Sequence, residues 1–174
     1  MAPLRLGIII LSDKASQGER EDLSGPLLRD LAVRGGWNVE KLEVLPDDPE
    51  RLEQLLLDYS DKLGLDLILT SGGTGLSSRD TTPEVTARVL EKEIPGIAEI
   101  LRIKGFEKKK TAVLSRGRAG FRGRSLIINL PGSPAAAAEG WEILQPVIPH
   151  ALEVLQGRGA ECGLPGVNLQ DRQR

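Results

Sequence analysis

The sequence has 174 residues, 40% of them hydrophobic and 28% charged, with a formal net charge of -2. A chain of this length can bury one well-formed core but is too short for two comfortable domains. The balanced charge argues against a nucleic-acid binder, which normally carries a basic excess or tract. The single cysteine, Cys162, excludes an internal disulfide framework, and with the single histidine, His150, it cannot supply the usual zinc ligands.

Location and catalytic chemistry are constrained in the same way. No apolar stretch is long enough to span a bilayer and no signal-peptide pattern follows Met1, so we expect a cytoplasmic protein without membrane association. His150 lies in a proline-started helical stretch, and we interpret it as structural. The basic run 108–110 is interpreted as a solvated helix end, with attraction of an anionic substrate as the alternative.

Strand-like and helix-like runs alternate along the chain, which is typical of an α/β domain with a largely parallel sheet. The apolar run at 6–11 predicts a strand covered on both faces. The expected strands, in chain order, are 6–11, 39–45, 65–70, 111–114 and 125–130. The expected helices are 26–34, a stretch capped by Asp48 and containing Tyr59, a stretch from Thr81 to Pro95-Gly96, 97–106, and two from Pro134 to Leu155.

We therefore expect residues 1–157 to form one domain, a three-layer αβα sandwich with a mostly parallel central sheet. Residues 158–174 are rich in Gly, Gln and Arg and show no periodicity, so we expect a mobile or peripheral tail.

In open α/β sheets, ligands bind outside the carboxyl ends of the strands. Four predicted strand ends lead into unusual loops, and a basic, glycine-bearing loop lies near the same edge. These loops are 12–16, 46–48, 71–80 and 131–134, together with 115–123.

The loop after the third predicted strand is rich in glycine: Ser71, Gly72, Gly73, Thr74 and Gly75. Glycines allow a ligand to approach the backbone closely and permit φ > 0, and exposed N–H groups can cradle a phosphate. A plain strand-to-helix turn is the alternative. The loop is neither a Walker A motif nor a dinucleotide fingerprint, because the residues that those motifs require are missing. Pro131, Gly132 and Ser133 have a similar design, in which Ser133 caps a helix.

Two carboxylates, Asp47 and Asp80, are expected near this phosphate cradle. Without a cation they would repel a phosphate, whereas Mg²⁺ would make them metal ligands or indirect anchors. The alternatives are a turn residue for Asp47 and a helix N-terminal residue for Asp80. Asp48 is better explained as a helix cap.

At these loops the sequence resembles the MogA/MoaB family, which includes the gephyrin and plant Cnx G domains. The resemblance covers roughly residues 4 to 157 and depends on several motifs that occur in the same order. They are Ser12–Ser16 with Gly18, Thr70–Gly75, Arg79–Glu84, Leu114–Arg116 and Asn129–Pro134.

The resemblance implies a three-layer αβα fold, usually trimeric, and an enzyme that joins the terminal phosphate of molybdopterin to AMP from ATP. It also implies that the reaction requires Mg²⁺ and releases pyrophosphate. The family's catalytic acids correspond to Asp47 and Asp80, and its glycine loop is associated with the nucleotide. The other implied cleft residues are Ser12, Ser115, Arg116, Pro131, Gly132 and Ser133.

Two other functions remain open. One is a MoaB-like protein that binds molybdopterin without turnover, and the other is a structural trimer resembling a gephyrin-type scaffold. A molybdenum-inserting protein is a further expected partner.

Overall fold

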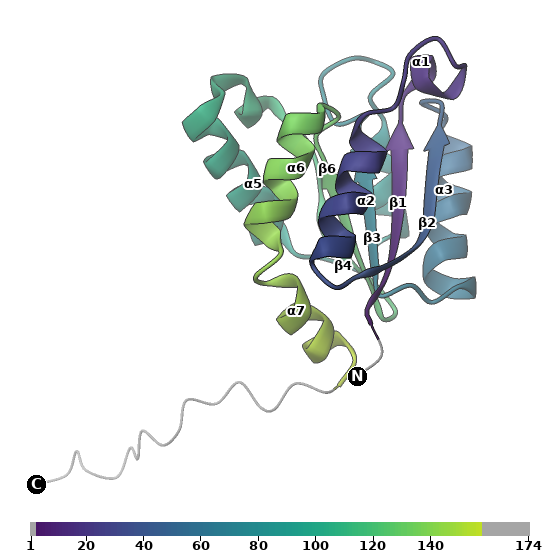
Figure 1. Ribbon diagram of the computed structural model, residues 1–174, viewed down its shortest axis with the longest axis vertical. Coiled ribbons are helices and arrows are strands. Elements are labelled where there is room, and N and C mark those ends of the chain that lie inside the picture. The colour runs from purple at the N-terminus through teal and green to yellow at the C-terminus, as the bar shows by residue number, and fades with distance from the viewer. Residues whose placement is uncertain (1–2, 158–174) are drawn as a thin grey trace, which may run out of the picture.

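The computed structural model describes residues 3–157, so the expected tail 158–174, with Cys162, lies outside the described residues. Six strands form one sheet in the order β2-β1-β3-β6-β5-β4 (Figure 1). The four strands β2, β1, β3 and β6 are parallel, while β5 and β4 add an antiparallel edge. The predicted mostly parallel sheet is confirmed. Strand bounds are Arg5–Leu11 (β1), Asn38–Leu45 (β2), Leu67–Ser71 (β3), Lys92–Glu93 (β4), Ala119–Arg122 (β5) and Ser125–Leu130 (β6).

The helices connect these strands, and two of the capping residues expected from the sequence are confirmed. Asp48 caps α3 by accepting from the amides of Glu50 and Arg51, and Ser133 caps α6 by accepting from the amide of Ala136. Thr81 stands at the start of α4, but its side chain makes no capping hydrogen bond. The α-helices are Asp13–Ser16 (α1), Ser24–Arg34 (α2), Pro49–Leu57 (α3), Thr82–Val89 (α4), Pro95–Lys108 (α5), Pro134–Leu144 (α6) and Ile148–Leu155 (α7).

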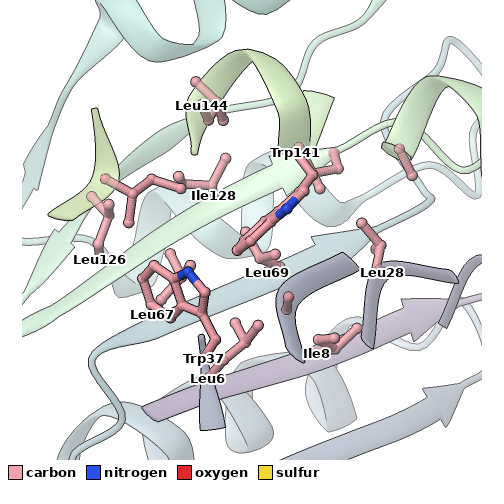
Figure 2. Close-up of a cluster of buried hydrophobic side chains, with 14 of the residues drawn as sticks. Leu6, Ile8, Leu28, Trp37, Leu67, Leu69, Leu126, Ile128, Trp141 and Leu144 are labelled. Atoms are coloured by element: carbon pink, nitrogen blue, oxygen red, sulfur yellow. The ribbon is translucent and has the colours of Figure 1, made fainter. Parts of the chain in front are cut away.

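Successive side chains of a strand point to opposite faces of the sheet, and each face carries its own hydrophobic core. In β1, Leu6 and Ile8 face the core shared with α2, α6 and α7, whereas Ile9 faces the core shared with α3 and α4. Figure 2 shows the first core, in which the rings of Trp37 and Trp141 meet edge to face with centroids 5.7 Å apart. Buried apolar side chains on both faces explain the continuous apolar strands and establish the expected three layers.

One predicted strand is wrong. Residues 111–114 lie within a 3₁₀ helix, Lys110–Leu114 (η2), packed beside α5, and Val113 and Leu114 are about half exposed. The fifth strand is instead Ala119–Arg122, inside the segment expected to be a loop. It pairs with β6 through a tight hairpin in which Gly123 has a φ of 54°. A positive φ at that glycine suits a hairpin turn, and pairing with a buried strand outweighs the weak strand pattern of β5.

Two further expectations concern His150 and membrane association. His150 lies on an exposed part of α7 near Glu153. Among residues 3–157, no helix has both the length and the apolar character required to cross a membrane.

Candidate functional site

The loops after β1, β3 and β6 meet at the carboxyl edge of the sheet. The chain runs from β1 outward to β2 and then crosses back to β3, so strand order reverses between β1 and β3. Ligands of open α/β folds bind outside such a switch point. The Ser71 hydroxyl donates to the carbonyl of Pro131 at 2.8 Å, and the Gly72 amide donates to Leu130 at 3.2 Å. A Cβ on Gly132 would lie 3.2 Å from the Cα of Gly72. The loops after β3 and β6 are therefore in backbone contact.

The glycine loop, residues 71–75, needs its glycines for two different reasons. Gly72 and Gly73 have φ values of 111° and 64°, which L side chains rarely adopt. Gly75 has no positive φ, but a Cβ there would lie only 2.9 Å from Oδ2 of Asp80. The first two glycines therefore permit the turn, and the third permits a carboxylate to approach the loop.

Both predicted acids lie against this loop. A Cβ on Gly73 would be 3.4 Å from Oδ1 of Asp47, while Asp80 sits beside Gly75. Oδ2 of Asp80 accepts a hydrogen bond from the Ser77 amide at 2.8 Å. Asp13, which sequence reasoning did not assign to the site, joins them by accepting from the Asp47 amide at 2.9 Å.

The surroundings of Asp47 disfavour the ionised form of its side chain. Burial raises the pKa of Asp47, and repulsion from Asp13 and then Asp80 raises it further. A backbone N–H of Asp13 and the charge of Arg79 offset part of the rise. Arg79 also pairs with Asp13 at 2.7 Å. When ionised, the cluster of Asp13, Asp47 and Asp80 carries negative charge that a bound cation would neutralise.

The carboxylates of Asp47 and Asp80 fit a Mg²⁺ ion that substrate phosphates also hold. Within residues 3–157, no group of three or more His, Cys, Asp or Glu side chains is placed to hold a metal ion alone. Mg²⁺ is commonly held by one or two carboxylates together with substrate phosphates. Asp47 and Asp80, which lie against Gly73 and Gly75 of the glycine loop, are two carboxylates that could serve in that way.

Charge removal at Asp47 provides a test of this electrostatic account. Because the pKa of Asp47 is raised in the folded chain, folding favours its protonated form. Its ionisation therefore reduces stability as pH rises from the unfolded value, about 3.9, through the higher folded value, and the penalty is complete above it. We expect Asp47→Asn to melt on the order of 1–2 °C higher than the parent at pH 7.

Thermal melts between pH 4 and pH 8 measure this effect, and the gain should shrink toward pH 4. Asp48→Asn is the matched control, because Asp48 caps α3 and asparagine caps equally well. Millimolar Mg²⁺ added together with ATP should then stabilise the parent more than Asp47→Asn. A lower melting temperature for Asp47→Asn at pH 7 would contradict the account.

Beside the glycine loop lies a cavity of about 350 Å³. Its polar side includes five of the predicted residues: Thr74, Gly75, Ser115, Pro131 and Ser133. Its other walls come from α5, η2 and α6 and are largely apolar. These walls include Ala98, Leu101, Leu114, Ala136, Gly140 and Ile143, with Arg102, Lys109 and Glu139 adding charge. A cavity with apolar walls and a few polar groups is suited to a small organic ligand.

The remaining predicted residues lie outside the lining of this cavity. Asp47, Asp80, Gly72 and Gly73 form the adjoining acid and glycine cluster. Ser12 accepts from the Ala15 amide at 3.3 Å and caps α1. Ser71, the last residue of β3, is buried against the loop after β6, and Gly132 contacts Gly72. Arg116 turns toward α4, where it pairs with Glu84.

Sequence reasoning missed several residues that shape the cavity. Asn129 is buried in β6, and its amide nitrogen donates to the hydroxyls of Thr70 and Thr86, each at 2.9 Å. Its carbonyl oxygen accepts from the Arg118 amide at 3.0 Å. An asparagine within an otherwise apolar strand was the available signal, since buried polar groups need partners. Arg102 gave no comparable signal, because its location depends on how α5 packs. Lys109 belongs to the basic run 108–110, which is exposed at the end of α5 as expected, and it also lines the cavity.

The fold and site together define an α/β protein in which a glycine-rich loop, two acids and a cavity with largely apolar walls meet at the switch point. A family model described as "Probable molybdopterin binding domain" matches residues 7–150. The chain belongs to this family, as the MogA/MoaB resemblance implied.

Individual relatives agree with this membership. The chain is 38% identical over 159 residues to a molybdopterin adenylyltransferase of Helicobacter pylori, covering 90% of each protein. Identity to the molybdopterin adenylyltransferase of Escherichia coli is 33% over 171 residues, covering 90% of this chain and 88% of the relative. The crystal structure of a molybdopterin biosynthesis enzyme, MoaB, from Thermus thermophilus is 48% identical, with a TM-score of 0.84 over 88% of this chain and 97% of that one.

Proposed function

We propose that the chain is a Mg²⁺-dependent molybdopterin adenylyltransferase acting in molybdenum cofactor biosynthesis. Its substrates are ATP and molybdopterin, and its products are adenylyl-molybdopterin and pyrophosphate. The observation that carries the proposal is the placement of Asp47 and Asp80 against a glycine loop that borders the cavity. The named activity of relatives that match nearly their full length supports the same reaction.

In the proposed reaction, a terminal phosphate oxygen of molybdopterin attacks the α-phosphorus of ATP. A new P–O bond forms, the bond from the α-phosphorus to the bridging oxygen breaks, and pyrophosphate leaves with that electron pair. The nucleophile is already ionised near neutral pH, so the chain needs no strong base. Its role is alignment and charge neutralisation.

The described residues divide these tasks by position. The N–H groups of the glycine loop orient the ATP phosphates, and Asp47 and Asp80 would hold Mg²⁺, which supplies charge neutralisation when bound. Ser133, at the N-terminus of α6, lines the cavity and places the positive end of that helix toward an anionic group. The apolar walls from α5 and α6 exclude water from the pterin.

Pyrophosphate release separates catalysis from binding alone. The chain with ATP, Mg²⁺ and molybdopterin should release pyrophosphate continuously, and omission of any one component should abolish it. Molybdopterin binding by calorimetry without pyrophosphate release would identify a binding protein instead. Failure to bind the pterin at all would leave the scaffold alternative.

We also propose a cytoplasmic homotrimer. Four large apolar side chains on the neighbouring elements α5 and η2 are 41–58% exposed in the single chain. They are Ile103, Phe106, Val113 and Leu114. Exposed apolar patches commonly mark protein interfaces.

Sedimentation equilibrium at micromolar concentration should give the mass of three chains. Ile103→Glu, which adds a charge outside the cavity, should shift the mass toward one chain. A single-chain mass for the unmodified protein would contradict the proposal.

A further inference from the structure

Arg116 lies between η2 and β5, yet its guanidinium reaches toward the glycine loop and α4. Its Nε donates to the carbonyl of Gly75 at 2.7 Å, and Nη2 donates to the carbonyl of Asp80 at 2.5 Å. Nη1 pairs with Glu84 in the first turn of α4. Each nitrogen of the guanidinium therefore already has a partner, and all three partners lie within residues 75–84.

The backbone around Arg116 belongs to the cavity wall. Ser115 and Gly117 line the cavity, and their carbonyls accept from Nη1 of Arg102 on α5, at 3.4 and 3.3 Å. The Arg116 amide donates to Thr74 at 2.9 Å. The tripeptide 115–117 is thus held from α5 on one side and linked to the glycine loop on the other.

We infer that Arg116 is a positioning residue that fixes the glycine loop and Asp80 relative to the cavity. This inference rests on the proposed function and replaces the substrate-contacting role that the family resemblance implies for Arg116. The planar guanidinium can donate in several fixed directions at once, whereas a lysine ammonium acts as a point charge. Loss of this link lets the loop that orients ATP move relative to the pterin, and small misplacements of reacting groups strongly slow a reaction.

The test compares Arg116→Lys and Arg116→Gln with the unmodified chain. Both should lower kcat by about 10- to 100-fold while KM for molybdopterin changes by less than about three-fold, the pattern of lost alignment. In the substrate-free chain, the amides of Ser77 and Asp80, which are paired within the loop, should exchange with deuterium faster.

Two further variants act as controls. Arg118→Lys alters a neighbouring arginine whose guanidinium pairs with Glu93 on β4 instead of with residues 75–84, so kcat and loop exchange should stay at parental values. Glu84→Gln removes the ion pair but leaves both carbonyl contacts of Arg116, so its loss of kcat should be smaller than that of Arg116→Gln. It also provides a folded test if the Arg116 variants do not fold.

Three outcomes would overturn the inference. Parental kcat and exchange in Arg116→Lys would show that the contacts position nothing, and an equal loss in Arg118→Lys would show that the effect is not specific. A raised KM for molybdopterin with unchanged kcat would show that Arg116 binds the substrate directly. If the unmodified chain transfers no AMP, the proposed function fails, while the exchange comparison still decides whether Arg116 fixes the loop.

Discussion

Asp80→Asn is expected to reduce the turnover of molybdopterin adenylylation by at least about 100-fold. The reason is the position of Asp80, whose carboxylate lies against Gly75 beside the cavity. Asparagine is nearly the same size, and its amide oxygen can still accept from the Ser77 amide, so the loop should keep its conformation. The loss of turnover would therefore result from removal of the negative charge that is proposed to hold Mg²⁺. Steady-state kinetics with varied Mg²⁺ measure it.

The control for Asp80→Asn is Asp48→Asn, which removes a carboxylate of the same size at the start of α3 and keeps its cap. Its turnover should remain within about two-fold of the parent. Asp47→Asn should lose turnover as Asp80→Asn does, with its affinity for molybdopterin less affected. Near-parental turnover in Asp80→Asn would remove Asp80 from the mechanism.

Gly73→Val is expected to weaken ATP binding by at least about ten-fold, with less effect on molybdopterin. Gly73 has a φ of 64°, and an added Cβ would meet the side chains of Thr82 and Asp47. The substitution thus strains the turn and fills space beside the proposed metal-binding acid. In the proposed site, molybdopterin contacts other loops and the apolar walls, so its affinity should fall less. Calorimetric titration of each ligand measures the two affinities.

The structure supplies a control for the backbone strain alone. Gly36, after α2 at the opposite edge of the sheet, has a φ of 84° and open space where a Cβ would lie. Gly36→Val should therefore lower the melting temperature without changing the affinity for ATP. If Gly73→Val remained folded and bound ATP as tightly as the parent, the glycine loop would not be a nucleotide cradle. If it lost both ligands equally, the glycine would serve only the turn.

The parallel part of the fold could be predicted because its strands are apolar on both faces. The runs at Leu6–Leu11 and Ser125–Leu130 are buried almost throughout, and such runs indicate a covered sheet. The antiparallel edge could not be predicted in the same way. Ala119–Arg122 has little alternation of its own and becomes a strand by pairing with β6. The segment 111–114, with β-branched Thr111 and Val113, lies within a 3₁₀ helix in which Val113 and Leu114 are partly exposed.

The site residues also differ in how well the sequence predicts them. Residues at or just beyond the carboxyl ends of strands, such as Asp47 and Ser71, could be placed at one edge because parallel strands end together. The contributions of α5 depend on where a helix packs, so Arg102 was not anticipated. The direction of the Arg116 side chain likewise depends on acceptors that come close only in the fold.

The proposed reaction is tested most directly by following the α-phosphorus of ATP. With ATP labelled at that position, Mg²⁺ and molybdopterin, the chain should transfer label to the pterin with one pyrophosphate released per label transferred. A pterin lacking the terminal phosphate should accept none. Tight binding of molybdopterin with no transfer of label, under conditions in which a known adenylyltransferase transfers it, would contradict the proposed function.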